Sequence, residues 1–208
     1  EHGVLDKIDA VLTGYLGDSS LGHLVLETVE KIRKKNSNIR YICDPVMGDV
    51  GRGIFVKEDL PPFFHSMAVP AANVITPNQF ELTLLTGQRI SDMQTVLKAC
   101  HMLHKKGPDI ILVTSLITDE TKDDEIQMLV SSKDGTHDLV TTPKFDLNPA
   151  PNGSGDLTAA LFAGHLLQGI SVAESLKTTA ESVYKTFEQT ALSGERELAL
   201  IRSRDYFR

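Results

Sequence analysis

The chain has 208 residues, of which 41% are hydrophobic and 24% are charged, a composition typical of one globular domain. Its formal net charge of −7 would repel the phosphates of nucleic acid, and no basic stripe offsets that charge. No apolar run is long enough to cross a membrane, and two cysteines are too few for a disulfide framework. We therefore expect a cytoplasmic protein with neither nucleic acid nor a membrane as its partner.

Apolar periodicity in the first half of the chain predicts strands that alternate with helices. Short apolar runs ending in turn residues predict strands at 8–13, 40–43, 73–76 and 109–114. Apolar residues at helical spacing predict helices at 20–33, within 56–67, at 78–85 and at 91–106. Such alternation favours a parallel sheet.

The pattern changes after residue 114. Strands predicted at 125–132 and 137–142 flank a Lys-Asp-Gly turn, which indicates an antiparallel hairpin, and helices are expected at 156–168, 172–191 and 195–202. We predict a single domain over 1–208: an α/β open sheet, mostly parallel with an antiparallel edge hairpin, with helices on both faces. Ligands of such sheets bind beyond the carboxyl ends of the parallel strands.

The strongest candidate site is the run Asn152, Gly153, Ser154, Gly155 and Asp156, directly before a predicted helix. Its glycines let backbone N–H groups converge on an anion, and the helix dipole adds positive potential there. Asp156 could accept the proton of an alcohol that attacks phosphorus. Taken alone, the run is equally compatible with an ordinary loop in which Asp156 caps the helix.

Carboxylates follow two neighbouring predicted strands. Asp44 and Asp49 lie in the run Asp-Pro-Val-Met-Gly-Asp, and Glu81 closes the run Thr-Pro-Asn-Gln-Phe-Glu that starts at Thr76. Mg²⁺ commonly takes one or two carboxylates together with waters and nucleotide phosphates, so these side chains suit a Mg·ATP site. Each run alone also fits a strand-ending turn or an acidic helix start, and the prediction depends on their joint placement.

Two weaker signals accompany these motifs. Residues 48–53 are rich in glycine and carry Arg52, which suits a loop that contacts a nucleotide, although a solvated turn fits equally well. Cys100, His101 and His104 lie at helical spacing, but no second ligand cluster lies nearby in the sequence, so we expect partly buried helix residues rather than a metal site.

Together the motifs resemble those of the pyridoxal kinases of the ribokinase-like superfamily. The likeness runs from Val-Leu-Thr-Gly-Tyr at 11–15 to Glu-Leu-Ala at 197–199. It implies ATP-dependent phosphorylation of the 5′-hydroxymethyl group of pyridoxal, pyridoxine or pyridoxamine, with Mg²⁺, a monovalent cation (K⁺ or Na⁺), and a homodimer in the full-length form. Ser154 departs from the family, which usually has threonine there, but it keeps a hydroxyl.

The resemblance also implies a role for each motif residue. Asp156 would be the catalytic base, and Gly153, Ser154 and Gly155 would form the anion hole. Mg²⁺ and its waters would be held by Asp44, Asp49 and Glu81, with Asp44 and Thr76 near the monovalent cation. ATP would be contacted by Asn78, Thr114, Ser115 and Asn152. Tyr15 would lie against the pyridine ring, although a packed core tyrosine is the alternative.

The chain begins with Glu1 rather than Met, and the family's first strand, its vitamin-binding serine and threonine, and its lid strands would lie upstream of this residue. We therefore expect further residues before Glu1. If the polypeptide does begin there, nucleotide binding should survive while pyridoxal phosphorylation is weak or lost.

Three alternatives stay open at this point. A hydroxymethylpyrimidine kinase shares the fold and the Asp-Pro-Val-Met run, but that family typically has cysteine where this chain has Asp156. A ribokinase-like sugar kinase also has Gly-x-Gly-Asp here. A non-catalytic nucleotide-binding fragment would bind ATP without turnover.

Overall fold

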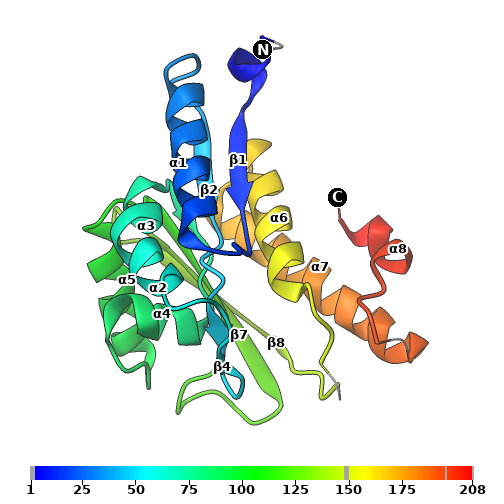
Figure 1. The fold of residues 1–208 in the computed structure, drawn as a ribbon. Coiled ribbons are helices and arrows are strands. Elements are labelled where there is room, and N and C mark those ends of the chain that lie inside the picture. Colours follow the sequence, from blue (N-terminus) through cyan, green and yellow to red (C-terminus); the bar gives the residue numbers. More distant parts are fainter. Residues whose placement is uncertain (1–2, 148–149, 195, 208) are drawn as a thin grey trace.

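The computed structural model describes residues 3–147, 150–194 and 196–207 (Figure 1). Its strands are β1 (Ala10–Thr13), β2 (Arg40–Cys43), β3 (Gly48–Asp49), β4 (Gly53–Ile54), β5 (Val74–Ile75), β6 (Ile110–Leu116), β7 (Glu125–Ser132) and β8 (His137–Pro143). Its longer helices are α1 (Ser19–Arg33), α4 (Gln79–Thr86), α5 (Met93–His104), α6 (Ser154–Leu167) and α7 (Val172–Ser193). Its short helices are η1 (Leu5–Lys7), α2 (Leu60–Phe63), η2 (Phe64–Ala68), α3 (Val69–Ala71), α8 (Leu200–Ser203) and η3 (Arg204–Tyr206).

The main sheet has the strand order β1-β2-β5-β6-β7-β8. The pairs β1–β2, β2–β5 and β5–β6 are parallel, whereas β6–β7 and β7–β8 are antiparallel. The predicted fold class is therefore confirmed, with β7 and β8 as the antiparallel hairpin at one edge. Because four neighbouring strands run in the same direction, the loops after β1, β2, β5 and β6 meet at one edge of the sheet.

Alternate side chains of the strands enter two different hydrophobic layers, as expected for a sheet covered on both faces. Tyr41, Cys43 and Ile75 face a core that includes residues of α1 to α5. Their strand neighbours Ile42 and Val74 face a second core formed with α6 and α7. Figure 1 shows the same arrangement, with α6 and α7 on the opposite side of the sheet from α1 to α5.

Two predicted helices differ from the structure. The helix expected within 56–67 is a continuous segment in which α2 leads through the π-helical turn η2 into α3. The last helix expected at 195–202 is the shorter α8, and its expected first residue, Glu195, lies outside the described residues.

Polarity and length argue against a membrane-spanning helix. Among the described residues, no helix is both long and apolar enough to cross a bilayer. Cys43 and Cys100 are both buried and are not joined by a disulfide.

Substitutions at two glycines can measure how tightly the helices pack. A Cβ on Gly107 would lie 2.4 Å from the backbone oxygen of Pro70, whereas a Cβ on Gly164 in α6 would meet nothing within 4 Å. We expect Gly107→Ala to lower the free energy of unfolding by roughly 1–3 kcal/mol through overpacking. Gly164→Ala should raise it by up to about 1 kcal/mol through helix propensity. Urea unfolding measures both, and equal effects of the two changes would contradict the expectation.

Candidate active site

One cleft at the carboxyl edge of the parallel strands collects every site residue predicted from the sequence. Its lining includes the following predicted residues: Tyr15, Asp44, Asp49, Arg52, Thr76, Asn78, Glu81, Thr114, Ser115, Asn152, Gly153, Ser154, Gly155 and Asp156. The roles of these residues stay predictions, but the structure brings them together. Phe55 and Phe187 line the same cleft but were not predicted from the sequence. A single phenylalanine among other apolar residues carries no motif that would mark it as part of a site.

The N-terminus of α6 opens into this cleft without a side-chain cap. Gly153 precedes the helix in the left-handed conformation, with φ of 90°, and no side chain among the described residues caps the first turn. By contrast, α1, α4, α5 and α7 are each capped by the side chain of their N-cap residue. The N–H groups and dipole of α6 are therefore available to an anion in the cleft.

Asp156 lies in the first turn of α6 and its carboxylate faces β1. A Cβ placed on Gly14, directly after β1, would lie 3.2 Å from Asp156 Oδ1. The Asp156 carboxylate is also near Asp44, since its negative charge helps to raise the pKa of Asp44. The loop after β1 thus leaves room for this carboxylate because Gly14 has no side chain.

Asp44 is buried at the end of β2, with 5% of its surface exposed. Its Oδ1 accepts a hydrogen bond of 2.9 Å from the hydroxyl of Thr76. Burial raises the pKa of Asp44 to about 7; the Thr76 hydrogen bond opposes this change and the charge of Asp156 adds to it. Two neighbouring strands therefore hold one oriented carboxyl group at the floor of the cleft.

Glu81 is buried beside Asp44 and joins two loops of the site. Its Oε1 accepts from the backbone N–H of Met47, and its Oε2 accepts from that of Asn78, both at 2.9 Å. Burial, with the nearby charge of Asp44 second, raises the pKa of Glu81 to about 8. Asn78 completes a capping box at α4 and donates its side-chain amide to the carbonyl of Gly48.

The carboxylates of Asp44 and Glu81 suit a magnesium ion whose other coordination positions are filled by water and by a bound ligand. No three His, Cys, Asp or Glu side chains among the described residues could hold a metal ion by themselves. Asp44 and Glu81 form no ion pair within the described part of the chain, although both are buried acids. Mg²⁺ typically takes one or two carboxylates and leaves its other positions to water and phosphate. These residues suit such a site better than a complete protein cage.

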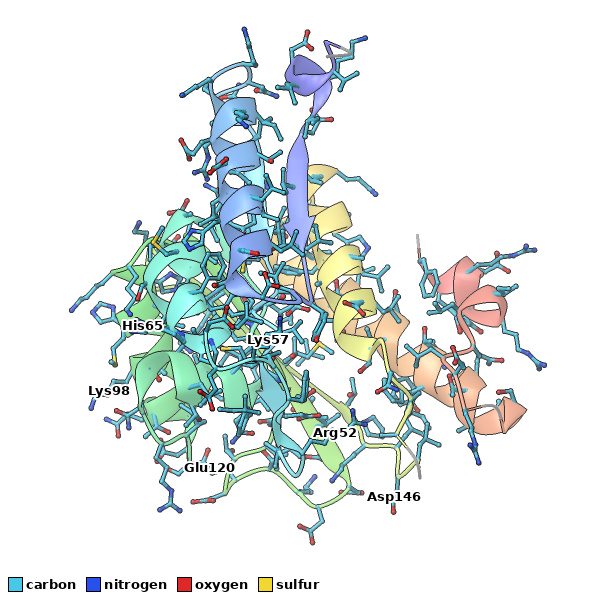
Figure 2. All side chains as sticks on the ribbon, viewed as in Figure 1. Arg52, Lys57, His65, Lys98, Glu120 and Asp146 are labelled. Carbon is cyan, nitrogen blue, oxygen red and sulfur yellow. The ribbon has the colours of Figure 1, made fainter. Side chains whose placement is uncertain are left out.

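Residues 48–53 form the hairpin of β3 and β4, where the sequence predicted only a loop. Gly51 and Gly53 take φ of 89° and 71°, which a tight antiparallel turn requires. At the turn, Arg52 donates a hydrogen bond of 3.2 Å to the side-chain oxygen of Asn152. Figure 2 shows Arg52 between the hairpin and the segment that leads to α6. Within the described lining of the cleft, no other arginine or lysine is present.

The end of β6 has a local irregularity at the cleft. Ser115 has φ of 50°, the only positive φ outside glycine among the described residues. The pairing of β6 with β7 shifts register between Val113 and Leu116, which marks a β-bulge. Strained bulges of this kind often re-aim side chains at functional sites, and no sequence pattern indicated this one.

A second, more apolar cavity adjoins the cleft. The two share Thr114, Ser115, Ser154, Gly155 and Phe187 in their linings. The second cavity also contains Phe145 and Tyr184, which pack with Phe187: the rings of Phe145 and Phe187 are stacked at 6.2 Å, and those of Phe145 and Tyr184 are tilted at 5.3 Å. An aromatic wall next to an anion site suits a flat heterocycle that carries phosphates.

A glycine-bordered helix N-terminus, buried carboxylates and an adjoining aromatic cavity at this edge of the sheet suit a kinase of the ribokinase-like class. Residues 4–199 match the family model described as phosphomethylpyrimidine kinase. The pyridoxal kinase PdxY of Rubrobacter xylanophilus is 45% identical over 206 residues, which cover 99% of this chain and 70% of the relative. The chain belongs to the pyridoxal kinases of this family.

Solved structures agree on the fold. The crystal structure of pyridoxal kinase from Entamoeba histolytica is 26% identical, with a TM-score of 0.86, and the match covers 98% of this chain and 70% of that one. The crystal structure of Plasmodium falciparum PdxK with the ligands AMP-PNP and PL is 25% identical, with a TM-score of 0.83, covering 95% and 69%. The family expected from the motifs is thus confirmed.

The raised pKa values of Asp44 and Glu81 predict a pH-dependent stability in the absence of divalent cations. The folded protein keeps these protons up to pH 7–8, whereas the unfolded chain releases them near pH 4. Between these values the folded state binds more protons, so the free energy of unfolding should fall as the pH rises. The loss should amount to a few kcal/mol, since one pKa unit corresponds to about 1.4 kcal/mol.

The measurement is thermal unfolding in EDTA at pH 5 to 8 of the parent, of Asp44→Asn and of Glu81→Gln. Buried His104 and His165, whose pKa values burial lowers, give a slope of opposite sign, so each variant is compared with the parent. The control is Glu120→Gln, because Glu120 is exposed at the margin of the molecule (Figure 2). Parallel pH curves for the parent and both site variants would contradict the prediction.

Proposed function

We propose that this protein transfers the γ-phosphoryl group of ATP to the 5′-hydroxymethyl group of pyridoxal, and of pyridoxine and pyridoxamine. The observation that carries the proposal is the position of Asp156, which lies at the uncapped N-terminus of α6 and faces Gly14 across the cleft. A base and an anion site on the same helical turn are the two elements that alcohol phosphorylation requires.

The two adjoining cavities divide the nucleotide between them. The aromatic cavity beside Phe145, Tyr184 and Phe187 would hold the adenine, and the shared residues Ser154 and Gly155 would hold the phosphates. In this order the terminal phosphate would lie in the cleft with Asp156. Thr114 and Ser115 lie at the junction, where a nucleotide would pass from one cavity to the other.

The vitamin would enter the cleft from the side of β1 and the hairpin. Tyr15 is 61% exposed and Phe55 is 47% exposed, so both rings can contact a pyridine ring without displacing core contacts. This exposure argues against the alternative that Tyr15 packs in the core. The names of the relatives support the choice of substrate, because they are pyridoxal kinases and one solved structure carries PL with an ATP analogue.

In the reaction, Asp156 accepts the proton of the substrate hydroxyl as its oxygen bonds to the γ-phosphorus and the bond to the β-phosphate oxygen breaks. The N–H groups at Gly153, Ser154 and Gly155 stabilise the charge on the equatorial oxygens of the transferring group. Bound Mg²⁺, held through Asp44, Asp49 and Glu81, would neutralise phosphate charge. Arg52 would supply a further positive charge from the hairpin.

Three finer points belong to the same proposal. Asp44 and Thr76, already joined by a hydrogen bond, would also lie next to the monovalent cation, K⁺ or Na⁺. The full-length protein would form a homodimer. The cytoplasm remains the expected location, in keeping with two cysteines that are buried and unpaired.

The central test replaces the base. We expect Asp156→Asn to lower kcat for pyridoxal by about 10²–10⁴-fold, because the amide cannot accept the proton, while ADP affinity changes little. The assay follows phosphorylated products from pyridoxal, pyridoxine, pyridoxamine, hydroxymethylpyrimidine and ribose with Mg·ATP. Unchanged turnover in Asp156→Asn would refute the assigned base. A preference for hydroxymethylpyrimidine would favour the second candidate, which the description of the family model supports.

A second test changes the space around that base. Because a Cβ on Gly14 would lie 3.2 Å from Asp156 Oδ1, Gly14→Ala should displace the carboxylate by a few tenths of an ångström. We expect kcat to fall about tenfold with little change in the KM for ATP. Gly17→Ala is the matched control, since a Cβ there meets nothing within 4 Å. Equal kcat values for the two variants would show that Gly14 does not position Asp156.

A further inference from the structure

The β-bulge near the end of β6 inserts one extra residue at the junction of the two cavities. Val113 pairs with Leu129 of β7, and Leu116 pairs with Gln127. Three steps along β6 therefore oppose two steps along β7, which is what a bulge produces. Ser115 lies within these three steps and has the positive φ of 50°. The ladder resumes at Leu116, so the irregularity is local.

The bulge decides which side chain of β6 leaves the core. In a regular strand, Ser115 would follow Ile111 and Val113 onto the face of the sheet that α1 to α5 cover. In the structure, Leu116 joins Ile111 and Val113 in that core, and it is fully buried. Ser115 is instead exposed and lines both cavities. The extra residue thus makes the Ser115 hydroxyl available to a ligand.

Such a conformation is held by contacts on both sides of the bulge. A serine at positive φ is strained, and it persists only where the surrounding structure fixes the chain. Before the bulge, the N–H of Thr114 donates a hydrogen bond of 3.0 Å to the carbonyl of Pro77. After it, the N–H of Ile117 donates one of 2.9 Å to the side-chain oxygen of Gln79. The segment that begins α4 therefore restrains both sides of Ser115.

Gln79 can act as an anchor because the start of α4 is itself rigid. It is the first residue of α4, directly after the N-cap Asn78. The capping box of Asn78 and Glu81 fixes this turn, and Asn78 also forms an isolated parallel bridge with Thr114. Gln79 is half-buried and is absent from the described linings of both cavities. Its influence on a ligand therefore passes through the backbone at Ile117.

We infer that Gln79 is a positioning residue for Ser115 in the nucleotide site. By accepting the hydrogen bond of Ile117, its amide oxygen keeps the bulge in the conformation that presents the Ser115 hydroxyl at the junction of the cavities. A hydroxyl held in place beforehand can bind a phosphate without a further cost of ordering the loop. The inference rests on the proposed function only in taking the ligand at that junction to be a nucleotide.

The test is a double-mutant cycle that is followed by calorimetric titration with ADP. Gln79→Met keeps the length and the helix propensity of the side chain but removes the acceptor for the Ile117 N–H. Ser115→Gly removes the hydroxyl and, because glycine tolerates positive φ, also removes the strain that Gln79 opposes. We expect each single change to weaken ADP binding about fivefold, the effect of roughly one hydrogen bond. The KM for pyridoxal should stay unchanged.

The double variant distinguishes positioning of Ser115 from an independent structural effect of Gln79. If Gln79 acts through Ser115, adding Gln79→Met to Ser115→Gly should change little, and ADP should again bind about fivefold more weakly than to the parent. Independent effects would multiply to about 25-fold. Gln94→Met is the matched control, because Gln94 is exposed in the first turn of α5, and its ADP affinity should match that of the parent.

The outcomes separate this inference from the proposed function. Parent-like ADP affinity in Gln79→Met, multiplied effects in the double variant, or an equal loss in Gln94→Met overturns the inference, even if the parent phosphorylates pyridoxal. If the parent binds ADP and the two changes are non-additive but no pyridoxal is phosphorylated, the substrate assignment fails and the positioning role stands. A parent that does not bind ADP overturns both.

Discussion

The site depends on a pair of buried carboxyl groups that meet where the parallel strands end. Asp44 follows β2 and Glu81 lies in the first turn of α4, yet each is less than a tenth exposed. Burial raises the pKa of both carboxyl groups, and the charge of Asp44 raises the pKa of Glu81 further. Their hydrogen bonds to Thr76, Met47 and Asn78 tie the loops after β2 and β5 together. Burying two acids is costly without a cation, so the same interaction that organises the cleft favours a bound metal ion.

Two helix starts at this edge serve different purposes. The first turn of α4 is closed by the reciprocal hydrogen bonds of Asn78 and Glu81, which makes it a rigid wall. The first turn of α6 lacks such a cap and begins with a left-handed glycine, which leaves its N–H groups for a ligand. A closed helix start beside an open one gives the cleft a fixed acidic side and a side that accepts phosphate.

Glycine acts here mainly by leaving space for other groups. Gly14 makes room for the Asp156 carboxylate, and a Cβ on Gly48 would collide with the ring of Phe80 and the carbonyl of Gly53. The backbone after β1 can therefore approach the Asp156 carboxylate, and the β3–β4 hairpin can approach α4. Gly14 and Asp156, like Gly48 and Phe80, lie more than thirty positions apart in the sequence.

The sequence by itself determined the alternation of strands and helices and the identity of the motifs, because periodicity, caps and glycine runs are local properties. It predicted β2 and β7 with their observed bounds, and it placed every predicted site residue in what proved to be one cleft. Only the tertiary structure decided the close approach of Gly14 to Asp156, the strained φ of Ser115 and the close approach of Gly48 to Phe80. These features come from packing between distant segments, and no spacing along the chain encodes them.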